Sequence, residues 1–94
     1  MIKLIRMMDK QFRINIPNEL LEHLNFLKGE KVAFCQHPEG MLIKKMDNLK
    51  DCRVIGFATI DPNGRIIIPK DLREGCKSFE VFAFNQGLIL KEAD

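Results

Sequence analysis

The fold is best predicted from one stretch of the chain, Asp61 to Arg73, which reads DPNGRIIIPKDLR. Its first four residues are typical of a tight turn, because proline presets and glycine tolerates the backbone angles that turns require. The apolar run RIII then predicts a β-strand. Pro69 removes an amide donor, which ends the strand and opens a short helix. The stretch therefore predicts a turn, a strand and a short helix in succession.

The same pattern occurs a second time, in the first half of the chain. The segment from Asp9 to Glu22, DKQFRINIPNELLE, matches residues 61–74, with aspartate, arginine, two isoleucines, proline, leucine and glutamate at equivalent positions. After a three-residue deletion the match resumes, and the stretch 32–43 corresponds to 81–90. Such a repeat indicates two structural units. Each unit has about forty residues, which is too few to hold a core alone, so we expect the two copies to share one.

The second strand of the first copy is predicted over residues 12–16. Phe12, Ile14 and Ile16 alternate with polar residues and should face inward, which puts Arg13 on the outer face. The other predicted elements are a loosely alternating first strand near residues 2–8, helices at 18–24 and 70–74 capped by Asn25 and Gly75, hairpins at 31–36 with 41–45 and 80–84 with 88–91, and a linker at 48–52. Leu20 and Leu24, one helical turn apart, should dock inward.

Composition indicates a folded, soluble protein, with 46% apolar and 30% charged residues in a chain of 94. No segment approaches the roughly 18 to 20 uncharged apolar residues that cross a bilayer. The charged start of the chain lacks the apolar core of a secretory signal. We therefore expect a cytoplasmic protein with no membrane partner.

The cysteines form an odd, scattered set, Cys35, Cys52 and Cys76, without a CxxC spacing. This pattern argues against both a disulfide framework and a zinc site. We expect reduced thiols, with Cys35 buried, and no metal or cofactor. Because nothing in the chain combines a nucleophile, a base and an oxyanion donor, we do not expect an enzyme.

Residues 61–73 and the stretch LNFLKGEKV, Leu24 to Val32, resemble the AbrB, SpoVT, MazE and MraZ superfamily, and with the repeat the resemblance covers nearly the whole chain. In this family each module is β-β-α-β-β, and two modules exchange hairpins around a twofold axis. The resemblance implies a mostly β fold with short helices. Residues 1–47 and 53–94 would be tandem swapped-hairpin modules, interleaved as one pseudo-twofold, β-barrel-like unit.

The resemblance also implies a DNA-binding transcriptional regulator, since the family contacts duplex DNA with basic side chains on the first turn and second strand. Arg65 matches the arginine of the Gly-Arg pair, Arg73 that of the Leu-Arg pair, and Arg13 the first of these in the other copy. Arg6 occupies a position that is often basic in AbrB-like modules. The candidate DNA contacts, with two neighbouring basic residues added, are Arg65, Arg73, Arg13, Arg6, Lys70 and Arg53.

The first copy departs from the family pattern. Phe12 stands where the pattern has glycine, and Leu21 stands where the second copy has Arg73. In the second copy, Ile67 replaces the polar Asn15 beside the arginine. We expect from Ile67 that another chain covers part of this face, and that whole chains associate into homo-oligomers.

Three alternatives stay open. Arg13 and Arg65 are also placed to pair with Asp9 and Asp61 across the turns, as ordinary surface ion pairs. An antitoxin that binds a toxin is a second function, which the short segment after the last predicted strand disfavours. A protein-interaction module that has lost DNA binding is the third, and a net charge of only +2 permits it. The phenylalanines in strand-like runs, Phe34, Phe57, Phe79, Phe82 and Phe84, are expected in the core.

Overall fold

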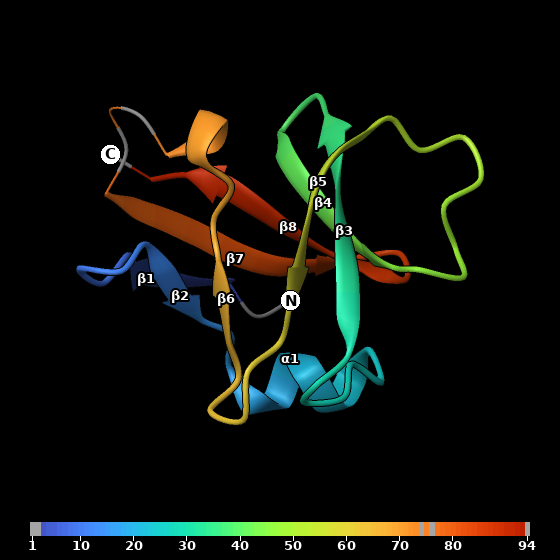
Figure 1. Ribbon diagram of the computed structural model, residues 1–94, viewed down its shortest axis with the longest axis horizontal. Helices are drawn as coiled ribbons and strands as arrows, with labels where there is room; N and C mark the ends of the chain where they lie inside the picture. The colour runs from blue at the N-terminus through green and yellow to red at the C-terminus, as the bar shows by residue number, and fades with distance from the viewer. Residues whose placement is uncertain (1–2, 74, 76, 94) are drawn as a thin grey trace.

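The computed structural model describes residues 3–73, 75 and 77–93 of the chain. Within these residues it is mostly β, with one short α-helix and one 3-10 turn (Figure 1). The elements are β1 (Lys3–Met7), β2 (Arg13–Asn15), α1 (Asn18–His23), β3 (Lys31–His37), β4 (Gly40–Lys45), β5 (Val54–Thr59), β6 (Arg65–Ile67), η1 (Lys70–Leu72), β7 (Ser78–Phe84) and β8 (Gly87–Glu92).

Six strands form one antiparallel sheet in the order β1-β7-β8-β4-β3-β5. Strands from the two halves of the chain are neighbours within it, because β1 pairs with β7, β8 with β4, and β3 with β5. The expected barrel-like closure is not found among the described strands. The sheet is open, and β1 and β5 are its edges.

The other two strands, β2 and β6, pair with each other as a separate antiparallel ribbon. Two backbone hydrogen bonds extend this pairing: Ile16 N donates to Gly64 O at 2.9 Å, and Ile68 N donates to Phe12 O at 2.8 Å. Each turn that precedes one strand therefore lies beside the end of the other strand. In Figure 1, α1 and η1 lie at opposite ends of β6.

Among the described residues, one buried cluster contains side chains from both halves of the chain. The inward residues of the ribbon, Ile14 and Ile66, pack in this cluster together with sheet residues such as Phe34 and Phe79. Leu20 is buried there as predicted, and Leu24 packs against it while partly exposed. Burial of these apolar side chains is the main favourable contribution to folding.

Most of the predicted turns and hairpins are confirmed, with strand ends shifted by a few residues. Asn25 and Gly75 adopt the left-handed conformation expected of helix caps, with φ of 59° and 72°. The predicted helix at 70–74 is a 3-10 turn that ends at Leu72, and Glu74 lies outside the described residues. No side chain of this turn is fully buried, although Leu72 packs against the core while partly exposed.

Three phenylalanines were predicted wrongly. Phe12 does not point inward. Its φ of 62° is not that of a strand residue, so β2 begins only at Arg13 and the ring of Phe12 is 44% exposed. Phe57 and Phe84 are exposed as well, whereas the other strand phenylalanines, Phe34, Phe79 and Phe82, are buried as expected. Phe57 lies on the edge strand β5, where only β3 neighbours it, and the ammonium nitrogen of Lys31 in β3 lies 4.9 Å from the centre of its ring.

The expectation of reduced thiols was also wrong for one pair. Cys35 of β3 and Cys52, just before β5, form a disulfide with their Cα atoms 5.7 Å apart. The two cysteines are 17 residues apart in the sequence, and their spacing did not indicate a contact. They meet because β5 pairs antiparallel with β3. Cys35 is buried as predicted, and Cys76 lies outside the described residues.

No helix in the described part of the chain has the length and apolar character that crossing a membrane requires.

Candidate nucleic-acid interface

The outer face of the β2–β6 ribbon brings two of the candidate arginines together. In the register Arg13 lies opposite Ile67, and Asn15 lies opposite Arg65. Since Ile14 and Ile66 between them are buried, alternation along the strands turns these four side chains outward. Arg13 and Arg65 are diagonal neighbours, a relation that puts Cα atoms about 7–8 Å apart.

The turn before β2 holds Arg13 through Asp9. One carboxylate oxygen of Asp9, Oδ1, accepts hydrogen bonds from the backbone amides of Gln11 at 2.8 Å and Arg13 at 3.0 Å. The other oxygen, Oδ2, accepts from Arg13 Nε at 2.8 Å. The carboxylate thus closes the turn and orients the guanidinium at the same time.

The turn before β6 repeats this arrangement. Asp61 Oδ1 accepts from the amides of Asn63 at 2.9 Å and Arg65 at 2.8 Å, and Oδ2 accepts from Arg65 Nε at 2.9 Å. In both turns the residue before the arginine has a positive φ: 62° at Phe12 and 78° at Gly64. Glycine adopts this conformation without steric cost, whereas phenylalanine does not.

Both aspartates are held as carboxylates. The hydrogen bond donated by the Arg13 amide is the largest cause that lowers the pKa of Asp9 below its ordinary value of 3.8, and the Arg13 side chain and the Gln11 amide add to it. The Arg65 amide and side chain lower the pKa of Asp61 in the same way, with help from the Asn63 amide. Desolvation of each carboxylate opposes these effects.

The pairing of Arg13 and Arg65 with the two aspartates, one of the alternatives left open by the sequence, is therefore present. It offsets the charge of each arginine. It also engages Nε only, and among the described residues no hydrogen bond involves the terminal Nη nitrogens of either side chain. Both side chains remain about a quarter exposed, at 26% and 28%.

The other candidate residues are dispersed. Arg73 lies at the Phe12 end of the ribbon, with its guanidinium carbon 4.0 Å from the centre of the Phe12 ring. Lys70 is exposed on η1. Arg6 lies on β1 opposite Phe79, and its Nε is buried without a hydrogen-bond partner.

Arg53 is separated from the ribbon. It precedes β5, where its carbonyl accepts a hydrogen bond from Gln36 N at 2.9 Å, whereas the turn that carries Arg65 follows the other end of β5. Two polar residues beside the candidate arginines, Lys10 and Asn15, were not among the predicted contacts. Lys10 is exposed in the turn beside Arg13, and its position between Asp9 and Arg13 was the available signal.

No protein-family model matches the chain, and no curated protein matches its sequence.

Proposed function

We propose that the chain is a DNA-binding transcriptional regulator of the AbrB-like type, which contacts duplex DNA through the outer face of the β2–β6 ribbon. The observation that carries the proposal is the placement of Arg13 and Arg65 on one outer face, at equivalent turns. A guanidinium held at Nε by an aspartate keeps its Nη donors available for a phosphate or a guanine edge.

The shape and composition of the ribbon support the same partner. The major groove of duplex DNA admits a two-stranded β-ribbon. Asn15 and Ile67 are exposed on the same face, where Ile67 lies opposite Arg13 and Asn15 lies opposite Arg65. An amide side chain recognises adenine, and an apolar side chain contacts the thymine methyl group.

The strand pairings support the AbrB-like assignment. Each strand of the first half has an equivalent in the second half: β1 and β5, β3 and β7, β4 and β8. If every strand is replaced by its equivalent, the sheet order is the same list read from the opposite edge. The ribbon register has the same property, since Arg13 opposite Ile67 corresponds to Arg65 opposite Asn15. We infer that residues 1–47 and 53–94 are two swapped-hairpin modules related by a pseudo-twofold axis, each of which supplies one arginine to the interface.

The test is a titration of mixed-sequence duplex DNA across a salt series. Each lost phosphate contact lowers the slope of log affinity against log salt by about 0.9, so R13A with R65A should lower it by roughly 2 and weaken binding at every salt concentration. The matched control is K50A, because Lys50 is an exposed cation in the linker between β4 and β5, far from β2 in Figure 1. Binding that is absent, indifferent to salt or unchanged in the double variant contradicts the proposal.

A second candidate function, association with another protein chain, is favoured by apolar side chains near the ribbon. Ile67 is 55% exposed and Phe57 51% exposed, and both line one hollow beside Arg73. Large exposed apolar groups are typical of interaction surfaces. If this function replaces DNA binding, I67S shifts the native mass to a smaller assembly, and the DNA titration shows no saturable complex.

A further inference from the structure

We propose that the two ends of the β2–β6 ribbon recognise different bases, so that one chain binds a DNA site that is not an inverted repeat. The Arg13 end contains Arg13 and the opposite residue Ile67, and the Arg65 end contains Arg65 and the opposite residue Asn15. This inference rests on the proposed function and deepens it, because it names the kind of sequence that the outer face selects. A protein surface with exact twofold symmetry matches a palindromic site. A difference between the two ends removes that match.

The arginines themselves do not distinguish the two ends. Each donates from Nε to the aspartate four residues earlier, Arg13 to Asp9 at 2.8 Å and Arg65 to Asp61 at 2.9 Å. Their side chains are exposed to nearly the same extent, 26% and 28%. Contacts from these two residues to phosphate or guanine are therefore equivalent, and a preference for one direction has to come from their neighbours.

Asn15 brings an amide side chain to the Arg65 end. It is exposed, and its Nδ2 donates one hydrogen bond to the carbonyl oxygen of Asn63 at 3.4 Å. One Nδ2 proton and the Oδ1 acceptor remain available, since no described residue donates to Oδ1. A donor and an acceptor on one amide are the groups that pair with N7 and N6 of adenine. The Arg65 end therefore favours adenine.

Ile67 holds the equivalent position at the Arg13 end, and its side chain is 55% exposed. It has no polar side-chain atom, so it contacts the C5 methyl group of thymine but leaves the donor and acceptor of adenine unpaired. An inverted repeat presents the same base at both equivalent positions and mismatches one end. Adenine at one position and thymine at the other satisfy both ends.

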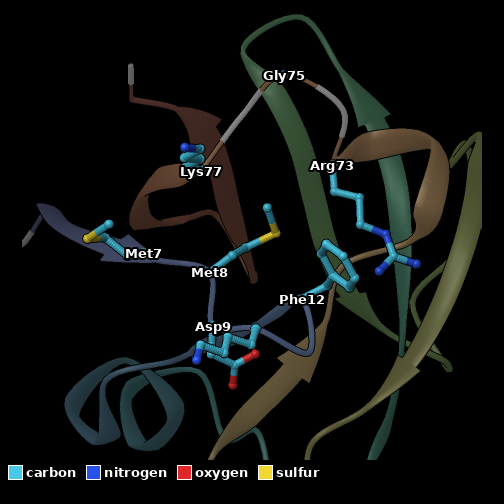
Figure 2. Close-up of a pocket in the computed structure, with 8 residues that line it drawn as sticks. Met7, Met8, Asp9, Phe12, Arg73, Gly75 and Lys77 are labelled. Atoms are coloured by element: carbon cyan, nitrogen blue, oxygen red, sulfur yellow. The ribbon is translucent and has the colours of Figure 1, made fainter.

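A second difference, in shape, lies beside the same two ends. Phe12 precedes Arg13, and its ring is 44% exposed. Figure 2 shows the Arg73 guanidinium against this ring, with 4.0 Å between the guanidinium carbon and the ring centre. The equivalent residues beside the Arg65 end are Gly64, which has no side chain, and Leu21, which is buried. The two ends therefore do not present the same surface to a duplex, whichever bases they contact.

The first experiment selects duplexes with the whole protein from a library randomised over about one helical turn, so that each duplex offers one site to one ribbon. The enriched site is then compared with two palindromes, one built from each of its halves. Both palindromes should bind about tenfold more weakly than the enriched site, because one mismatched position costs roughly that factor. Enrichment of an inverted repeat, or a palindrome that binds as tightly as the enriched site, overturns the inference.

Two substitutions make the ends alike and should change this preference. I67N gives both ends an asparagine, and N15I gives both an isoleucine; both positions are exposed, so we expect the variants to fold. Each variant should bind one palindrome about tenfold more tightly than the site enriched by the unmodified protein, and the two variants should prefer opposite palindromes. The control K50A, in the linker, should keep the original preference. An original preference that persists in both I67N and N15I overturns the inference.

Failure of this inference is distinguishable from failure of the proposed function. Salt-dependent duplex binding that is weakened in R13A with R65A, together with enrichment of an inverted repeat, retains the proposed DNA contact and removes only the recognition of a non-palindromic site. The absence of saturable binding to any duplex overturns both.

Discussion

At the scale of single residues, the two turns show how one backbone conformation can carry different side chains. Asp9 and Asp61 make the same hydrogen bonds to the amide and Nε of an arginine four residues later. The outer-face position of Arg13 was predictable from strand alternation. The ion pair of Arg13 with Asp9 was one of the alternatives that the sequence left open. Residue spacing alone does not show whether a guanidinium faces a carboxylate or solvent.

The direction of Phe12 was not predictable from alternation. The repeat aligned it with Gly64, and that alignment was the available signal, since a glycine at an equivalent position indicates a positive φ. The apolar character of phenylalanine favoured an inward direction instead. Local turn geometry prevailed over hydrophobic periodicity because the Asp9 turn imposes the backbone angles at Phe12.

Substitution of Asp61 by asparagine should reduce stability only where the carboxylate is ionised. Because its pKa in the folded state lies below the ordinary 3.8, the stabilisation is fully present above that value and is lost as the pH falls through the lowered pKa. D61N should therefore unfold at lower denaturant than the unmodified protein at pH 7, and the difference should shrink in acid.

The measurement is denaturant unfolding across a pH series, with D47N as a control in the exposed linker. A deficit in D61N that stays constant from neutral pH to well below the ordinary aspartate pKa would show that the carboxylate charge does not contribute.

Among the secondary-structure elements, the turns and hairpins were predictable from local sequence chemistry. The helix predicted at 70–74 was not, because this segment forms only the 3-10 turn η1. Pro17 before the helix and Asn25 after it were sufficient to predict α1. This helix also buries Leu20 and Leu21 in the core. The equivalent segment η1 has no buried residue, so packing does not extend it into a full helical turn.

The two hairpins, β3–β4 and β7–β8, meet where β4 pairs with β8, and glycines allow the close approach there. β4 pairs with β8, and a Cβ on Gly87 would stand 2.6 Å from the carbonyl oxygen of Ile43 in β4. Gly40 has the equivalent close approach to the carbonyl of Leu90 in β8. G87A should therefore destabilise the fold by about 1–3 kcal/mol, since the backbones must separate.

The effect is measured as the change in the denaturant midpoint, with E39A at the exposed hairpin tip as the control. If G87A unfolds at the same midpoint as the unmodified protein, β4 and β8 do not approach as described.

At the scale of the whole molecule, the shared core was predictable, because units of about forty residues do not bury enough surface alone. The pairing of strands across the halves was not derivable from periodicity and entered through the resemblance. The disulfide was missed because Cys35 and Cys52 meet only through the β3–β5 pairing. Scattered cysteines indicate a bond only once the strand order is known.

Reduction of the Cys35–Cys52 bond should lower the stability of the whole fold. A closed loop of this length contributes about 3 kcal/mol, and for a domain of this size the Tm should fall by more than about 10 °C. Thermal unfolding with and without dithiothreitol measures the shift, and C35S with C52S should abolish it. A Tm indifferent to dithiothreitol, with both thiols free to alkylation, would show that the bond is absent.

One strand from each half places Arg13 and Arg65 as diagonal neighbours on one outer face, and we propose that this face binds duplex DNA. Heteronuclear NMR of the labelled protein tests it most directly, by following the backbone amide and arginine Nε–H signals while mixed-sequence duplex is added. We expect saturable shifts at both arginines, Asn15 and Ile67, and no shift at the hairpin-tip amides of residues 39, 85 and 86. Shifts confined to the hairpin tips or to the linker at 48–52, with both arginine signals unmoved, would contradict it.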